Sequence, residues 1–402
     1  MKPLRPTTLH ILEPGGAQPL GWPLLRLGFR PFYLGAAALA ALAVPVWVLA
    51  LLGYVSAVAA VHSVWWHAHE MLFGFVAAVI VGFLLTAGKS WANLPTPRGA
   101  ALGALALLWL AARITALGGV PYAVHAVLDA ALLPTVAFIF ARLLVRAGNR
   151  RNYPIAAILA LLAVANGVFH LAVLDLLPLS PRTPLHAGLA LVVMLECIIG
   201  GRVIPGFTQS ALPGVKLAAL PWLERLTLGS TGLGLALWVA DSTPLFTACA
   251  LGVAAVCHGL RQWRWQPWAT RQRPILWILH AAYAWLPLSF GLLALAQGGW
   301  VNPSLGLHGL AVGLTGGLII GMLTRTARGH TGRSVVASVW DTTMYALVVS
   351  AAVVRVVLPA LTPAHTQLAW LISGALWGIA FLIYCAVYAP WLTRTRADGL
   401  DG

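Results

Sequence analysis

Charged residues are scarce in this chain, and acidic residues are the scarcest of them. Asp, Glu, Lys and Arg together make up 9% of the 402 residues, and only ten residues are acidic. A soluble protein carries about 25% charged residues. Hydrophobic residues make up 60% of the sequence, and the mean hydropathy is +0.86. This composition excludes an ordinary soluble enzyme and predicts an integral membrane protein.

Cysteine is also rare, and the alternating pattern of a β-barrel is missing. The four cysteines all fall inside apolar runs, and Cys249 and Cys257 lie eight residues apart in one of them. That spacing is about 12 Å along a helix, which is too long for a disulfide. A transmembrane barrel needs alternating segments of about ten residues, whereas these apolar runs are continuous. Because helices satisfy their own backbone hydrogen bonds in lipid, we expect an all-α polytopic bundle.

The apolar runs predict about twelve transmembrane helices in one bundle. Short loops connect them, and no low-complexity linker or cleavable signal is evident. The predicted spans are roughly 31–53, 67–88, 99–119, 123–146, 153–177, 184–208, 224–240, 243–262, 274–297, 304–326, 340–361 and 365–391. We therefore expect a cytoplasmic N-terminal segment over residues 1–30, a single transmembrane bundle over 31–391 and a cytoplasmic tail over 392–402.

Basic residues lie almost entirely on one side of this predicted topology. Of the 25 Lys and Arg residues, 22 fall on the termini and on every second loop, and only Arg113, Arg182 and Arg355 fall on the other side. The positive-inside rule then places both termini in the cytoplasm. The net charge of +15 reflects topology, so we expect the lipid bilayer, and not nucleic acid, as a partner.

Internal similarity points to three related four-helix units. Aligning His69 with His308 places Gly82 opposite Gly321, and His186 begins the sixth span in a corresponding position. The alternative is a chance match between helices rich in Gly and Leu. Histidines on the second, sixth and tenth of twelve helices resemble the topology of the haem–copper oxidase catalytic subunit. In that family the second and tenth helices supply axial haem ligands.

The segment Trp-His-Ala-His-Glu-Met at 66–71 places ionisable side chains at the start of an apolar span. A full charge in a membrane costs about 2.5 kcal/mol or more, and such residues usually serve a function. His67 and His69 point roughly 200° apart on a helix, so they would serve two sites. Imidazole with the Met71 thioether suits copper, and imidazole also suits haem iron. Glu70 would orient a ligand or carry protons; the alternative is a hydrogen-bonded interfacial cluster.

The other histidines divide into candidate ligands and structural residues. His308 heads a glycine-rich helix face and is the predicted partner of His69 in holding haem. His170 would complete a second site with His67, and His280 is a further candidate. We expect structural or loop roles for the rest, which are His10, His62, His125, His186, His258 and His365.

Three further features are also candidates. Residues near glycine-rich turns that could bind a propionate, a phosphate or a lipid head group are Arg202, His330 and Arg333. Positive-inside charge on a turn explains the last two nearly as well. Glu196 lies near the predicted bilayer centre and would relay protons or contact substrate; the alternative is a neutral packing role. Asp129 and Arg113 are expected to pair near the outer surface.

Five motifs resemble those of the NnrS family. They are Leu-Gly-Phe-Arg-Pro-Phe (27–32), Trp-His-Ala-His-Glu-Met-Leu-Phe-Gly-Phe (66–75), Gly-Phe-Leu-Leu-Thr-Ala (82–87), Gly-Gly-Arg-Val-Ile-Pro (200–205) and Gly-His-Thr-Gly-Arg (329–333). The resemblance spans about residues 20–360 and implies a multi-pass bacterial inner-membrane protein of the nitric-oxide response, with b-type haem and copper. The histidines that fit the family pattern are His67, His69, His170, His280, His308 and His330. Departures at 206–210 and at Lys89-Ser90 lie on the cytoplasmic side.

The expected function is therefore the handling of nitric oxide, which is apolar enough to arrive through lipid. If the protein is an oxidoreductase that reduces nitric oxide, quinol or a cytochrome would donate electrons, and Glu70 or Glu196 would carry protons. One alternative is a sensor or scavenger without turnover. Another is a transporter of haem, copper or a metal–nitrosyl species. A transporter should show two-fold repeats and broken helices, which the sequence does not show clearly.

Overall fold

The structure is a computed structural model that describes residues 21–56 and 59–400, and every element in these ranges is helical. The α-helices and the two π-helices (η2 and η5) are α1 (Phe29–Leu51), α2 (Ser63–His69), η2 (Glu70–Val76), α3 (Ala77–Ala92), α4 (Ala100–Thr115), α5 (Tyr122–Arg146), α6 (Tyr153–Val173), α7 (Arg182–Ala211), α8 (Pro221–Val239), α9 (Pro244–Arg264), α10 (Pro274–Gln297), α11 (Pro303–His308), η5 (Gly309–Gly316), α12 (Gly317–His330), α13 (Val339–Leu361) and α14 (Thr366–Leu392). Four short 3₁₀ turns complete the list: η1 (Pro23–Leu25), η3 (Arg150–Asn152), η4 (Pro267–Thr270) and η6 (Pro363–His365).

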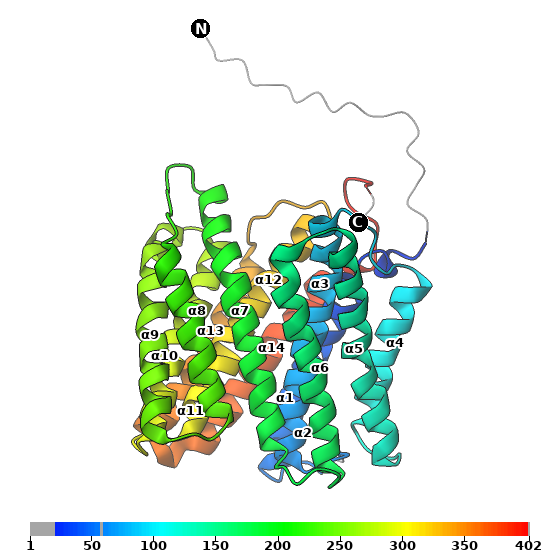
Figure 1. Cartoon of the computed structure of the whole chain (residues 1–402). Helices are drawn as coiled ribbons and strands as arrows, with labels where there is room; N and C mark the ends of the chain where they lie inside the picture. Colours follow the sequence, from blue (N-terminus) through cyan, green and yellow to red (C-terminus); the bar gives the residue numbers. More distant parts are fainter. Residues whose placement is uncertain (1–20, 57–58, 401–402) are drawn as a thin grey trace.

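The helices stand side by side in one bundle and alternate in direction (Figure 1). The segments α2–η2–α3 and α11–η5–α12 run on as single rods, so each predicted span has its counterpart. Ten of the described helices are long and apolar enough to cross a membrane. The other two rods are α4, which has 16 residues, and α8, which is less apolar. The all-α polytopic bundle is confirmed.

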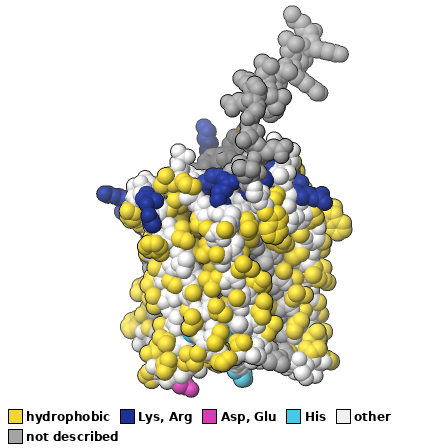
Figure 2. All heavy atoms as spheres, turned by 90° about the vertical axis from the view of Figure 1, so that its right-hand side faces the viewer, with side chains coloured by type: hydrophobic (Ala, Val, Ile, Leu, Met, Phe, Trp, Pro, Cys, Tyr) yellow, Lys and Arg dark blue, Asp and Glu magenta, His cyan; other side chains and the backbone are white. Residues whose placement is uncertain are grey.

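Basic side chains gather at one end of the bundle, which we call the basic end. It is the upper end in Figures 1 and 2, and hydrophobic side chains cover the flank below it. The chain enters at this end through η1, and α14 also finishes there. The fully buried guanidinium of Arg30 joins the two segments by donating to the carbonyls of Leu392 (2.9 Å) and Arg394 (2.8 Å). The cytoplasmic location of the basic end stays a prediction.

The second and tenth spans share an irregularity that the sequence alignment did not reveal. In both, a short α-helix ends on a histidine, His69 or His308, and a π-helix of seven or eight residues follows immediately. π-Helical segments are rare and occur frequently at functional sites. The sixth span, α7, is an unbroken helix of 30 residues. The likeness predicted between the second and tenth spans therefore extends to backbone geometry, whereas the sixth span lacks the irregularity.

The glycine-rich faces of these spans pack against neighbouring helices. A methyl group at Gly82 would touch Phe32 and Tyr33 of α1 at 3.0–3.1 Å, and one at Gly313 would overlap the Trp285 indole of α10. Neither position has room for a side chain unless its neighbours shift. Of the two uses that small residues allow, close approach of a helix or of a macrocycle, the structure shows the first.

We expect Gly201→Ala in α7 to destabilise the protein and the nearby Gly206→Ala to leave it unchanged. A methyl group at Gly201 would overlap Nη2 of Arg261, whereas nothing lies within 4 Å of one at Gly206. Arg261 cannot move aside easily, because Glu224 and the Tyr283 hydroxyl hold its guanidinium. Overpacking costs about 1–3 kcal/mol. Thermal unfolding in detergent compares the two variants, and equal melting temperatures would contradict this packing.

Candidate metal centre

Eight polar side chains meet inside the bundle near the end opposite the basic end. Four helical segments contribute them: the α2–η2 junction, α4, α5 and α6. We define the His69 cluster as His69, Glu70, Arg113, Tyr122, His125, Asp129, Asn166 and His170. Polar residues one turn apart on the same face form its wall, because His125 and Asp129 lie on α5 and Asn166 and His170 on α6.

Asp129 lies at the centre of the His69 cluster. Its Oδ2 accepts from Nε2 of His170 at 3.0 Å and from Nδ2 of Asn166 at 2.7 Å, and lies 3.3 Å from Nε2 of His69. Its other oxygen pairs with the guanidinium of Arg113. Ligand atoms from His69, Asp129 and His170 all lie within 4.8 Å of one another, and all three side chains are buried. Two imidazoles and a carboxylate thus converge on one point.

The second nitrogen of each converging imidazole is held by a neighbour. Nδ1 of His69 lies 3.3 Å from Oε1 of Glu70, and Nδ1 of His170 lies 2.8 Å from the Tyr122 hydroxyl. Histidines that ligate metals generally bond their other nitrogen to a carboxylate or similar group, which fixes the ring orientation. The cluster therefore has the outer partners of a metal site as well as the inner donors.

The charges of the cluster leave one negative charge to be balanced. With neutral imidazoles, the carboxylates of Glu70 and Asp129 face the single guanidinium of Arg113. Both nitrogens of His69 also face acceptor oxygens, since Nε2 lies 3.0 Å from Oδ1 of Asn166. The oxygens of Asn166 and Asp129 near Nε2 of His69 are satisfied either by a proton on that nitrogen or by a metal cation beside it. A buried uncompensated charge is costly, so this site favours a cation.

The donor set fits a transition metal ion. Imidazole nitrogens suit copper, iron, zinc and nickel, and two histidines with one carboxylate form the triad of non-haem iron sites. The ring of His125 lies 5.4 Å from that of His170, centroid to centroid, and offers a third imidazole. Residues His69, Asp129 and His170 would therefore hold a copper or iron ion, with Glu70 and Tyr122 orienting the two rings.

Sequence reasoning found only part of this cluster. It proposed His69, Glu70 and His170, gave His125 a structural role, and paired Asp129 with Arg113 near the surface. The pair exists, but both side chains are buried, at 4% and 6% exposed. Tyr122 and Asn166 were missed. The sequence does carry one indication of the cluster: His125 and Asp129 on one apolar span, and Asn166 and His170 on the next, are each four residues apart.

His67 and His308 lie apart from the His69 cluster. His67 points away from the cluster on the second span, and His308 is on the tenth span. The ring of His67 stacks on Trp47 of α1 with centroids 3.8 Å apart. His308 accepts at Nε2 from Arg355 of α13, at 3.1 Å. His67 and His69 thus serve different surroundings, as their spacing predicts. The pairing of His69 with His308 across one haem, and of His67 with His170 in one site, stays a prediction.

The other predicted metal and proton residues lie apart from both groups. His280 forms a hydrogen bond with the Thr208 hydroxyl at 3.0 Å, in the half of the bundle nearer the basic end. Met71 packs against the hydrophobic core. Glu196 accepts from the Thr315 hydroxyl of η5 at 3.1 Å. Glu196 is halfway along α7, so it lies near the middle of the bundle, away from the His69 cluster.

The predicted anion-binding residues at the basic end contact neighbouring segments of the protein itself. Arg202 donates to Oδ1 of Asn152 at 2.8 Å. Arg333 lies over the indole of Trp391, 4.3 Å from the ring centroid, and the ring of His330 lies 5.6 Å from that of Phe29. These contacts tie the 329–333 loop to α1 and α14, which supports a structural role alongside the predicted one.

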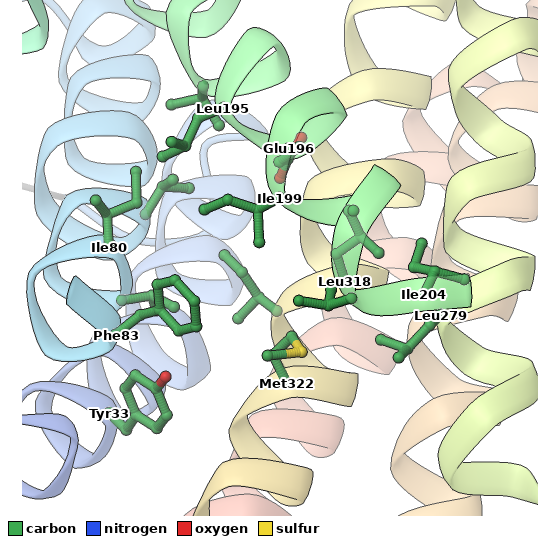
Figure 3. A pocket seen from close by; sticks show the side chains of 16 residues that line it. Tyr33, Ile80, Phe83, Leu195, Glu196, Ile199, Ile204, Leu279, Leu318 and Met322 are labelled. Carbon is green, nitrogen blue, oxygen red and sulfur yellow. The ribbon is translucent and has the colours of Figure 1, made fainter. Parts of the chain in front are cut away.

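A cavity of about 100 Å³ lies in the centre of the bundle, between the second, sixth and tenth spans (Figure 3). Glu196 and Tyr33 are the polar side chains in a lining that is otherwise aliphatic, aromatic or sulfur-containing. A space of this size holds a few small molecules such as water, and no histidine lines it. It does not fit a histidine-ligated haem, so we derive no step through haem.

Comparison with known families agrees with this architecture. A family profile described as "NnrS protein" matches residues 23–396, nearly the whole chain. No curated protein matches the sequence. The match includes both π-helical spans and all eight residues of the His69 cluster. The chain therefore belongs to the NnrS family, which indicates a multi-pass membrane protein of the nitric-oxide response.

Proposed function

We propose that the protein binds copper at the His69 cluster and handles nitric oxide there, in the bacterial inner membrane. The observation that carries the proposal is the convergence of His69, Asp129 and His170 on one buried point with a negative charge to balance. Family membership supports the link to nitric oxide. Haem stays a prediction from the family resemblance.

The surroundings of the cluster suit a small apolar substrate. Nitric oxide partitions into lipid, so it can reach a site inside the bundle without an aqueous channel. A bound copper or iron ion would supply a coordination position for it. Arg113 fixes the two carboxylates, and the Tyr122 hydroxyl, 2.8 Å from His170, offers a proton that can move within the cluster.

Reduction of nitric oxide would also need protons and an electron donor. Glu196 is the acidic side chain beside the central cavity (Figure 3), and we propose it as a proton carrier together with Glu70. Quinol or a cytochrome is the proposed donor. Without such a donor the same site would bind nitric oxide and act as a sensor or scavenger.

The test is nitric-oxide consumption by the purified, copper-loaded protein with a reductant. We expect sustained consumption in the wild type and a loss of about 100-fold or more in His170→Ala, since removing even the hydrogen-bond partner of a metal ligand typically costs about 10–100-fold. His186→Ala is the matched control, because His186 stacks on Trp238 outside the cluster. A single stoichiometric uptake would indicate a scavenger, and equal rates in both variants would reject this site.

A transporter is the second candidate, and one observation favours it. The π-helices lie at corresponding positions of two related spans, and transporters are built from internal repeats whose irregular helices form the binding site. Proteoliposomes loaded with a copper indicator distinguish the two functions. Protein-dependent copper entry without nitric-oxide consumption would replace the proposed function with transport.

A further inference from the structure

The two arginines that lie inside the bundle at the end opposite the basic end occupy related positions. Arg113 is on α4, the rod after the second span, and Arg355 is on α13, the rod after the tenth span. Each lies beside the histidine that precedes a π-helix, with His69 near Arg113 and His308 near Arg355. The likeness between the two spans therefore extends to their neighbours.

The two arginines differ in what balances their charge. Arg113 faces the carboxylates of both Glu70 and Asp129. Arg355 has no carboxylate partner among the described residues, and its contacts are the neutral groups of Ser304 and His308, each at 3.1 Å. The first site is therefore negative overall and the second is positive.

Unpartnered polar atoms surround Arg355. We define the Arg355 cluster as Trp47, His67, Ser304, His308, Arg355 and Trp370. The guanidinium carbon of Arg355 lies 5.9 Å from the centre of the Trp370 ring, and its charge acts on both His67 and His308. Nδ1 of His67 and Nε1 of Trp370 are both buried without a hydrogen-bond partner in the described part of the chain. Buried polar atoms of native proteins are nearly always paired.

We propose that the Arg355 cluster binds a small planar oxyanion. A guanidinium presents a fork of donors that matches a carboxylate or a similar oxyanion. The Trp370 indole offers a further donor, and Nδ1 of His67 offers another in the tautomer that carries its proton there; both atoms lack a partner among the described residues. His67, His308 and Arg355 are each partly exposed, so the cluster lies at the protein surface, whereas Nδ1 of His67 and Nε1 of Trp370 are themselves buried.

Two sources share this ligand chemistry. One is a free oxyanion of the size of nitrite. The other is a carboxylate that belongs to a bound tetrapyrrole. The inference goes beyond the proposed function and does not depend on a metal at the His69 cluster, because the two groups of residues are distinct.

Equilibrium dialysis against nitrite tests the proposal on detergent-purified protein prepared with and without haem. The ionic strength is kept constant with chloride, and bound nitrite is measured colorimetrically. We expect saturable binding of one nitrite per chain. Arg355→Gln should weaken it by about 10–100-fold, which is the value of a hydrogen bond to a charged group. Arg182→Gln is the control, since Arg182 is an exposed arginine at the same end.

The haem-loaded and haem-free samples distinguish the two sources. Nitrite binding in both indicates a free oxyanion, and binding in the haem-free sample alone, with less haem retained by Arg355→Gln, indicates a tetrapyrrole carboxylate. His67→Phe keeps the stack on Trp47 and should weaken nitrite binding without unfolding the protein. Absence of saturable nitrite binding from both samples, with unchanged haem content in Arg355→Gln, would overturn the proposal. Copper content at the His69 cluster should stay unchanged in all these variants.

Discussion

Copper should raise the melting temperature of the wild-type protein and leave that of Asp129→Asn unchanged. A ligand that binds only the folded state stabilises it by about 2.7 kcal/mol at a concentration 100 times its dissociation constant. Asp129 supplies the carboxylate on which both imidazoles converge. In the Asp129→Asn variant the amide would present one oxygen at most, without a charge. Wild-type protein should also release a proton on binding copper, because a nitrogen that binds the ion can no longer carry a proton.

Asp129→Asn should also lower the stability of the metal-free protein. The substitution leaves the buried guanidinium of Arg113 with Glu70 as its remaining carboxylate. Because Glu70 still balances the charge of Arg113, we expect a loss of about 1–3 kcal/mol, the cost of the buried hydrogen bonds that an amide cannot replace. Asp175→Asn is the matched control, since Asp175 lies at the C-terminal end of α6, outside the cluster, and Asn tolerates its positive φ of 56°. An equal copper-induced shift in wild type and Asp129→Asn would show that the cluster is an ion-pair network and binds no metal.

The second large effect is expected for Asp341→Ala at the basic end. Asp341 is fully buried and accepts from Arg328 (Nη2, 2.5 Å), Tyr388 (2.5 Å) and both the backbone and side chain of Ser338 (2.7 and 2.8 Å). It caps α13 and connects it to α12 and α14. Removing it leaves a buried cation and several donors unpaired, which should cost about 3–5 kcal/mol.

Detergent-based unfolding titrations measure this effect against a nearby control. Asp398→Ala removes an exposed carboxylate that pairs with Arg396 at the same end, and exposed ion pairs contribute about 0–1 kcal/mol. Asp341→Ala should therefore lower the free energy of unfolding much more than Asp398→Ala. A difference within error would mean that the α12–α13–α14 corner is held by apolar packing and that the buried network is dispensable.

The fold was predictable because each span can be recognised from its own stretch of sequence. Continuous apolar runs and alternating basic loops gave the twelve rods, and the structure bears them out. The two π-helices were not predictable, because nothing in the sequences of 70–76 and 309–316 distinguishes a π-helix from an α-helix. Their backbone geometry depends on what packs beside them, such as the Trp285 indole against Gly313.

The candidate site was predictable only where one helix determines it. The opposite directions of His67 and His69 follow from helix geometry, and the structure shows them in different surroundings. The convergence of Asp129 and His170 on His69 depends on the order of helices around the bundle, which no local pattern encodes. One signal did exist, because Arg113 and Arg355 break the positive-inside pattern. The structure places each of them in a histidine cluster.

Elemental analysis of copper and iron in wild type, His69→Ala and His67→Ala tests directly whether the His69 cluster binds a metal ion. All three are expressed with ample metal and purified in parallel. We expect a stoichiometric ion in the wild type and in His67→Ala, and loss of most of that ion in His69→Ala, because His69 and not His67 faces Asp129 and His170. A metal-free wild type, or equal loss in the two variants, would contradict a metal centre at the His69 cluster.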